Sequence, residues 1–267
     1  MIEEHSNAMT KPEPSRSSSP GRDPTRLKLQ YLLLAATVAA VLQIPFTIAL
    51  LPAADRAGSS LANSAANAAG TILLSYVMIR LGLRASSRVG FGALMLSGWD
   101  DGASRPALAR RTLVLASGIG VIVGVGVLVG MGLVSPYLPA GNVEDPAPWK
   151  GLLASMSAGI NEEILFRLGL MTSLAWLLTV LARRVTAGPI IAGVANVLAA
   201  LAFAAMHLPQ AKAFYGLSTL MILVVMVGNG VPGVVFGWLF RRFGLVSAMV
   251  AHFSADVVLH VVGPMIG

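Results

Sequence analysis

The sequence is poor in charge, in aromatic residues and, above all, in cysteine. Of its 267 residues, 12% are Asp, Glu, Lys or Arg, 6% are aromatic and none is Cys. The absence of Cys excludes disulfides and thiolate-bound metals, so any metal site must use His, Asp or Glu. Soluble domains carry roughly twice this share of charged residues, whereas here 55% of residues are hydrophobic and the mean hydropathy is +0.76. The chain is therefore predicted to be a polytopic membrane protein.

The sequence also lacks the alternation of polar and apolar residues that marks the strands of a membrane barrel. Its apolar runs are long and rich in Gly, Ala, Val and Leu, a composition typical of closely packed transmembrane helices. We expect an all-α fold of about seven membrane-spanning helices, eight at most, around a buried active site.

The net charge of +7 and the pI of about 10.4 would suggest a nucleic-acid partner if the protein were soluble. Most Arg and Lys residues, however, lie between the apolar runs, the pattern by which cytoplasmic loops fix the orientation of a membrane protein. We therefore expect the lipid bilayer and no nucleic acid among the partners. The same pattern places the N-terminus in the cytoplasm.

Three parts follow one another along the chain. Residues 1–26 are rich in Ser, Pro, Arg and Glu and cannot bury enough apolar surface to fold, so they are expected to form a disordered cytoplasmic tail. Residues 27–150 hold the N-terminal transmembrane helices. Residues 151–267 contain almost all of the ionisable groups that lie deep in apolar surroundings, and they are expected to form the catalytic membrane core.

Seven apolar runs are long enough to cross a membrane. Pro45 is expected to kink the first run. The sixth is interrupted by Gly and Pro residues between Gly228 and Gly233, so it forms either one kinked span or two half-length ones, and we prefer one. Residues 91–99 are expected to lie on the membrane surface. The expected spans are 27–51, 61–83, 112–137, 151–181, 189–207, 218–240 and 245–266.

Two expectations concern how these helices pack. The third span contains six Gly residues from Gly118 to Gly132, and Gly at four-residue spacing predicts a face on which helices approach closely. If the helices are straight, His207 lies at the outer end of its span and His252 near the inner start of its own. Tilted or unequal helices are therefore needed to bring the two histidines together.

Ionisable residues inside the apolar runs are few, and they fall in three segments. Charge inside a membrane span is costly, so each such residue is a functional hypothesis by default. Because nearly all of them belong to these three segments, we expect the segments to meet in one buried site. The candidate site residues are Glu162, Glu163, Arg167, His207, His252 and Asp256.

The fourth span carries two carboxylates and a guanidinium. Glu163 precedes Arg167 by four residues, the order and spacing of an ion pair on one helix face, and such a pair can be purely structural. Glu162 lies about 100° around the helix from Glu163 and has no basic partner nearby in the sequence. Its expected partners are the imidazoles of the other segments, which would make Glu162 a general base.

The two histidines allow two kinds of chemistry. His207 alone, near a helix end, is often structural, and His252 with Asp256 four residues later can be a simple buried hydrogen bond. Together with a glutamate they would suit a metal-activated water, with His207, His252 and Asp256 as ligands of Zn²⁺ or another divalent metal. They would equally suit metal-free hydrolysis, in which Glu162 and His207 activate water and a polar group of the last helix stabilises the oxyanion. The sequence leaves both routes open.

The same residues resemble the motifs of a known family of intramembrane proteases. Glu162–Arg167 is similar to the EExxxR motif of the CPBP family, which is also called Abi and comprises CAAX prenyl proteases of type II and bacteriocin-processing proteins. Phe203–His207 is similar to its FxxxH motif and His252–Asp256 to its HxxxN/D motif. The three motifs stand in the family's order on separate apolar segments. The resemblance covers about Gly151–Val262, and the first half of the chain is similar only in being hydrophobic.

The resemblance implies hydrolysis of peptide bonds in a membrane-associated peptide or protein. Many members have Asn where this chain has Asp256, and an ionised Asp cannot donate a hydrogen bond to an oxyanion. Asp256 would therefore stay protonated, orient His252 or act as a metal ligand. The family is described both as metallopeptidases and as glutamate-dependent peptidases, so the cofactor stays open. In chain order, the resemblance assigns the family's functional positions to Glu162, Glu163, Arg167, His207, His252 and Asp256.

The Ala- and Arg-rich composition and the long polar tail are typical of a protein of the bacterial plasma membrane, for which a prenylated substrate is not expected. Peptide maturation, bacteriocin self-immunity and membrane-protein turnover are the expected settings. Two other functions fit the same residues. A proton-coupled transporter or channel would use the buried carboxylates and imidazoles to relay protons, and a non-enzymatic membrane immunity or interaction protein would keep the motifs for structure alone.

Overall fold

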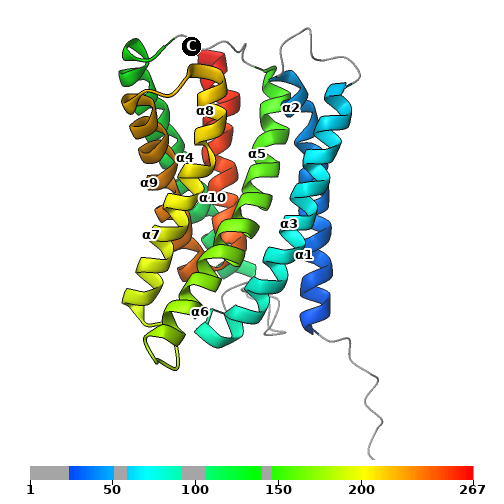
Figure 1. Ribbon diagram of the computed structural model, residues 1–267, viewed down its shortest axis with the longest axis vertical. Coiled ribbons are helices and arrows are strands. Elements are labelled where there is room, and N and C mark those ends of the chain that lie inside the picture. Colours follow the sequence, from blue (N-terminus) through cyan, green and yellow to red (C-terminus); the bar gives the residue numbers. More distant parts are fainter. Residues whose placement is uncertain (1–23, 51–58, 92–105, 140–145, 267) are drawn as a thin grey trace, which may run out of the picture.

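The computed structural model describes residues 24–50, 59–91, 106–139 and 146–266, and the regular structure within these ranges is entirely helical (Figure 1). The elements are α1 (Pro24–Leu42), α2 (Ile44–Ala49), α3 (Ser59–Val89), α4 (Pro106–Val134), η3 (Ser135–Tyr137), α5 (Pro148–Glu163), η4 (Ile164–Met171), α6 (Thr172–Leu181), α7 (Pro189–Met206), α8 (Leu208–Tyr215), α9 (Thr219–Phe243), α10 (Leu245–Val257), η5 (Val258–Val262) and α11 (Gly263–Ile266).

These elements combine into seven segments of the described chain that are long and apolar enough to cross a membrane. The segments run alternately up and down through the bundle (Figure 1). The prediction of an all-α polytopic membrane protein is confirmed, with seven spans rather than eight. The spans are Arg26–Ala49, Leu61–Val89, Arg110–Tyr137, Pro148–Leu181, Pro189–Tyr215, Thr219–Phe243 and Leu245–Ile266.

The sixth span stays a single helix although Pro232 lies inside it. Proline removes one backbone hydrogen bond and crowds the preceding turn, so neighbouring groups must compensate. Two carbonyl groups just after Pro232 accept hydrogen bonds from other helices, Gly233 O from the Arg167 guanidinium at 3.1 Å and Val234 O from the Asn196 amide at 2.9 Å. Gly233 also admits α7 closely, because a Cβ atom there would lie 3.0 Å from Ala200 Cβ. These contacts tie α9 to the fourth span and to α7 directly after the proline.

The fifth span extends beyond its predicted end at His207. The backbone turns at His207 and the helix resumes as α8, so the span reaches Tyr215. Pro209 lies in the first turn of α8, where a missing N–H group removes no helical hydrogen bond. His207 is therefore inside the span rather than at its outer end, which removes most of the expected difference in depth from His252.

Asn161 joins the first span to the fourth. Its side-chain amide, oriented to suit its partners, donates to Ala36 O and accepts from Ala40 N, each at 3.1 Å. The first span itself breaks at Gln43 between α1 and α2, and Pro45 stands in the first turn of α2. This break agrees with the kink predicted at Pro45.

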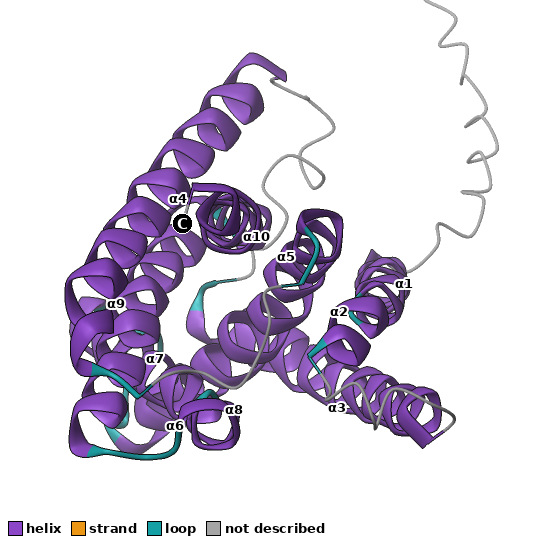
Figure 2. Cartoon of the chain, turned by 90° about the horizontal axis from the view of Figure 1, so that it is seen from above, coloured by secondary structure: helices purple, strands orange, loops and turns teal. Residues whose placement is uncertain are grey.

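The predicted Gly-rich packing face on α4 is present, but it is narrower than expected. A Cβ atom at Gly120 would meet the carbonyl oxygen of Ala251, and one at Gly124 would lie 2.6 Å from the carbonyl oxygen of Ala255. The other four Gly residues of this span have no neighbour within 4 Å of such an atom. Seen from above, α10 lies between α4 and α5 (Figure 2). The absence of a side chain at these two Gly residues thus allows α4 to pack closely against the helix that carries His252.

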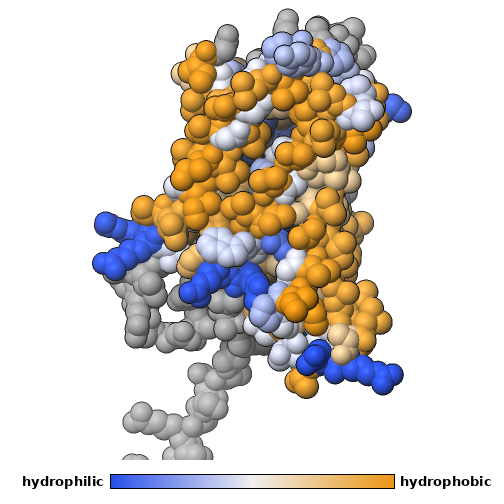
Figure 3. Space-filling view, turned by 90° about the vertical axis from the view of Figure 1, so that its left-hand side faces the viewer, coloured by the Kyte–Doolittle hydropathy of each residue, from blue (hydrophilic) through white to orange (hydrophobic). Residues whose placement is uncertain are grey.

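The outer surface agrees with a membrane environment. Apolar side chains cover much of the face in Figure 3, and hydrophilic ones gather near its lower end. Arg183 and Arg184 follow α6 at that end, and Arg241 and Arg242 end α9 there. The expected tail and the expected surface segment at residues 91–99 lie almost wholly outside the described residues. The cytoplasmic N-terminus, the bacterial origin and the three-part division of the chain stay predictions.

Candidate active site

The fourth span changes its helical geometry at the candidate site. α5 ends at Glu163, and the chain continues as the π-helix η4 to Met171 before α6 begins at Thr172. The hydroxyl of Thr172 donates to Arg167 O at 2.9 Å. Wider π turns often occur at functional sites because they redirect side chains that a regular α-helix would place elsewhere. Here the change falls directly after the two glutamates.

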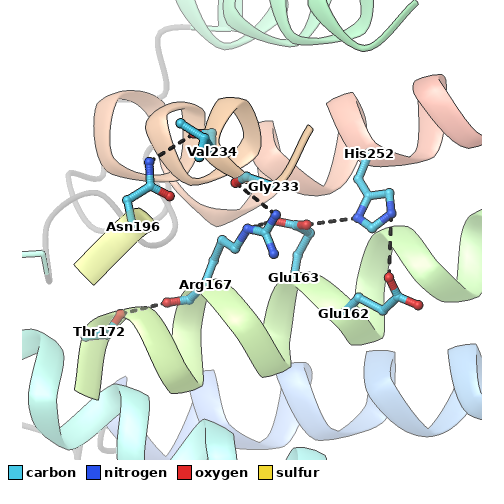
Figure 4. Close-up of polar contacts among 8 residues, drawn as sticks. All are labelled: Glu162, Glu163, Arg167, Thr172, Asn196, Gly233, Val234 and His252. Atoms are coloured by element: carbon cyan, nitrogen blue, oxygen red, sulfur yellow. Dashed lines mark hydrogen bonds and ion pairs between the residues drawn. The ribbon is translucent and has the colours of Figure 1, made fainter. Parts of the chain in front are cut away.

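Glu163 links two helices and is fully buried, with 0% of its side chain exposed. Its Oε2 atom lies 3.2 Å from Nε of Arg167 on the same span, so the predicted Glu163–Arg167 pair is present. Its Oε1 atom accepts a hydrogen bond from Nδ1 of His252 at 2.8 Å (Figure 4). The second contact was not predicted. It ties α5 to α10 at the centre of the bundle.

Arg167 is buried as deeply as Glu163, and its charge is balanced by several contacts. Besides the pair with Glu163, its Nη2 atom donates to Gly233 O on α9. The guanidinium carbon also lies over the rings of Phe203 and Phe236, 5.0 and 5.9 Å from their centroids. Such cation–π contacts gain strength where water is excluded. Arg167 therefore connects the fourth span to α7 and α9.

His252 faces carboxylates on both sides of its ring. Because its Nδ1–H group is bonded to Glu163, its Nε2 atom is the one turned toward Glu162 and Asp256. Nε2 lies 3.7 Å from Glu162 Oε2 and 3.6 Å from Asp256 Oδ2. The ring is stacked on Phe236, with centroids 4.9 Å apart and planes at 21°. Packing and the bond to Glu163 thus fix both the plane and the tautomer of this imidazole.

Glu162 is the most accessible carboxylate of the cluster, with 23% of its side chain exposed against 13% for Asp256. It also lines a cavity between α1, α2, α3 and α5. His207 interacts electrostatically with Glu162, and its Nδ1–H donates to Phe203 O at 2.9 Å, which leaves its Nε2 atom free for another partner. The Phe203 ring stands between the histidines, 4.9 Å from His207 and 5.8 Å from His252. The three segments selected from the sequence therefore meet around Glu162.

Several residues that shape the site escaped the sequence reasoning. Phe236 stacks on His252, and Gly233 supplies the carbonyl that Arg167 binds. Nothing in the sequence distinguishes Phe236 from the other phenylalanines. Phe203 could have been found, because it begins the motif that ends at His207.

The donor set does not fit a resident metal in the arrangement that the structure shows. Catalytic zinc in hydrolases commonly takes three protein ligands. No three His, Asp or Glu side chains of the described residues are placed so that they could hold one ion together. The roles of His207, His252 and Asp256 as metal ligands stay a prediction, and no chemical step is derived through a metal below.

Seven candidate membrane spans surround a cluster of buried carboxylates and imidazoles, the kind of groups that serve as proton relays and functional sites in membrane proteins. Residues 144–258 match the family model of the Rce1-like type II CAAX prenyl endopeptidases. This segment contains all six candidate residues, and its match confirms the resemblance to CPBP proteases that the motifs predicted. Comparison with curated proteins and with solved structures gave no match. The family supports a membrane-embedded protease with a membrane-associated substrate.

Proposed function

We propose that the protein is an intramembrane endopeptidase that hydrolyses peptide bonds of a membrane-associated peptide or protein, with Glu162 as the general base. The observation that carries this proposal is the position of Glu162. It lies next to His252 and interacts electrostatically with His207, and it lines a cavity. Glu162 and both histidines lie within the segment that matches a family of endopeptidases.

Water and a substrate can reach the carboxylate of Glu162, as a general base requires, whereas the carboxylate of Glu163 is fully buried. In the proposed reaction a water molecule attacks the scissile carbonyl carbon, and Glu162 accepts the proton that the water loses. The C–N bond then breaks, and Glu162 returns that proton to the leaving amine. The carboxylate is thereby regenerated, and the peptide ends as a free acid and a free amine. A general base at the correct distance contributes about 10²- to 10⁴-fold to such a rate.

In this proposal a neutral histidine positions the water by accepting its hydrogen at Nε2, whereas an imidazolium, which also carries a proton on Nε2, donates to the carbonyl oxygen. Each has its Nδ1–H group held by a fixed acceptor, Glu163 for His252 and the Phe203 carbonyl for His207. Each therefore keeps Nε2 for the reaction. Asp256 lies 3.6 Å from Nε2 of His252 and acts as the positioning residue for that ring. Such fixed polar groups cost little reorganisation as charge develops in the transition state.

Replacement of Glu162 by Gln tests the proposal, because the amide keeps the shape but cannot accept the proton of water. We expect cleavage of a quenched-fluorescent library of unmodified peptides in proteoliposomes to fall at least about 100-fold. The yield of folded protein should be unchanged. Glu13→Gln, outside the family segment, is the matched control. Cleavage that survives Glu162→Gln would refute the assignment, and proton flux without any cleavage would favour the transporter instead.

A further inference from the structure

The cavity beside Glu162 is built mainly by helices outside the family segment. It has a volume of about 200 Å³ and lies between the α1–α2 junction, the first half of α3 and the middle of α5. At its inner end it is lined by Glu162 and by Met206, the residue before His207. α2 and the start of α3 lie at the end of the bundle opposite the Arg pairs (Figure 1). We call this cavity the polar cleft.

The polar cleft carries hydrogen-bonding side chains along two helices. On α3 they are Ser64, Asn67 and Thr71, which share one face because they recur at intervals of three and four residues. Gln43 and Thr47 oppose them at intervals of one turn. Polar side chains inside a membrane span face the interior or a water-filled cavity, and they mark functional pathways. This polar face is therefore a candidate binding surface.

The chemistry of the lining restricts the ligand. Glu162 is the sole charged side chain among the described residues that line the cleft. The described lining holds no Lys or Arg that would balance the charge of a phosphate or a lipid headgroup. Amide and hydroxyl groups match a neutral ligand that has both N–H donors and C=O acceptors. The main chain of a peptide is such a ligand.

Gln43 carries an unused acceptor at this surface. Its Oε1 atom is buried, and no hydrogen-bond donor reaches it among the described residues. A buried polar atom without a partner costs about 1–3 kcal/mol, so it calls for a ligand or a water molecule. Thr47, by contrast, has its hydroxyl bonded to the main-chain oxygen of Gln43 at 3.1 Å. Because Gln43 lines the cleft, rotation of its side chain would present this buried oxygen to an N–H donor of a ligand there.

We propose that the polar cleft binds the unmodified, extended main chain of the substrate and leads the scissile bond to Glu162, with Gln43 accepting one main-chain N–H group. This inference rests on the proposed peptidase function and extends it to helices that the family match does not include. The α3 face from Ser64 to Thr71 spans roughly 10 Å. An extended chain covers that length with about three residues. The cleft thus holds about three residues on one side of the scissile bond.

Backbone methylation of the substrate tests the proposed role of Gln43 directly. One peptide that the wild-type protein cleaves is made in versions that carry a single N-methyl group at successive positions. At one position, methylation should raise KM of the wild type about tenfold, the loss expected for one hydrogen bond. Gln43→Met keeps the length of the side chain but lacks the amide oxygen. This variant should have a raised KM and an unchanged kcat, and methylation of the substrate at that position should not raise KM further.

A second measurement detects binding without catalysis. Because the chain has no Cys, Asn67→Cys in the Glu162→Gln background places a single reactive thiol in the cleft. Bound peptides from the library should slow the reaction of this thiol with a maleimide about fivefold or more. Leu73→Cys, on an outward face of α3 with 66% exposure, is the matched control and should not be protected.

The outcomes separate this inference from the proposed function. The inference is wrong if the wild type cleaves the peptide, N-methylation has no effect that depends on Gln43, and Asn67→Cys is not protected. The proposed peptidase function would then still stand. Protection without any cleavage by the wild type would support the cleft and overturn the peptidase. If Gln43→Met does not fold, Asn67→Leu replaces it, because Asn67 is exposed on α3 and its loss should not unfold the protein.

Discussion

Glu163 has two partners at once, Arg167 on its own span and His252 on α10, and none of the three side chains is more than 5% exposed. Charges removed from water are stable only while their partners remain, because an uncompensated buried charge costs several kcal/mol. The three residues therefore behave as one network. Loss of any member affects both the fold and the orientation of the imidazole next to Glu162.

Arg167→Met tests this network by leaving Glu163 buried without its guanidinium partner. We expect a loss of about 3–5 kcal/mol in the free energy of unfolding, measured by denaturation in mild detergent. Glu163→Gln combined with Arg167→Met removes both charges, while the amide oxygen still accepts from His252. The double variant should be more stable than the sum of the single losses implies. Strictly additive losses would contradict a coupled pair.

Metal analysis decides which hydrolytic route the histidines serve. Because three donors do not converge on one point, we expect protein purified without chelator to give the same metal content by mass spectrometry in the wild type, His207→Ala and His252→Ala. His260→Ala, outside the site, is the matched control. About one zinc per chain in the wild type, lost in both site variants while the fold is kept, would establish metal-assisted hydrolysis instead.

Sequence reasoning selected the ionisable residues of the site because a charge inside an apolar run stands out without any structure. It also predicted the pair of Glu163 and Arg167, since spacing along one helix determines which side chains are neighbours. The bond from Glu163 to His252 joins residues 89 positions apart. No rule of spacing reaches that far, and the stacking of Phe236 on His252 depends on the tertiary packing of α9 against α10.

At the scale of single helices, the end of the fifth span shows how one residue type can indicate two structures. Pro209 follows the predicted end of the span at His207, and proline commonly follows a helix end. Proline also suits the first turn of a new helix, and α8 begins in this way. The choice between the two depends on whether the chain remains in the bilayer. Apolar residues of α8 pack against α9, so the chain continues beside the bundle after His207.

The packing of α4 against α10 gives a prediction at this scale. Gly120→Ala would push a methyl group into the backbone of α10 at Ala251, next to His252. We expect lower thermal stability and at least about tenfold slower cleavage, because displacement of α10 moves His252 and Asp256 together. Gly118→Ala is the control: nothing lies within 4 Å of its added methyl group, so the higher helix propensity of Ala should leave it as stable as the wild type or more so. Equal effects of the two substitutions would contradict a packing role for Gly120.

For the whole molecule, the number of spans could be predicted because the thickness of the bilayer fixes the length of an apolar helix. The role of the first helices could not. The family match begins at residue 144, yet α1, α2 and α3, which precede it, form walls of the cavity at Glu162. Their polar residues are spread thinly along the sequence, and they form one surface only when the three helices pack around α5.

The orientation of the protein then determines from which side the polar cleft can be reached. If the Arg-rich ends face the cytoplasm, as the distribution of basic residues predicts, the α2 end of the bundle faces outward. In intact cells a membrane-impermeant maleimide should therefore label Asn63→Cys, near the start of α3, and should label Arg184→Cys only after permeabilisation. Both positions are exposed, and the Cys-free wild type is the blank. The reverse pattern would turn the cleft toward the cytoplasm, where the substrate would have to be a cytoplasmic segment.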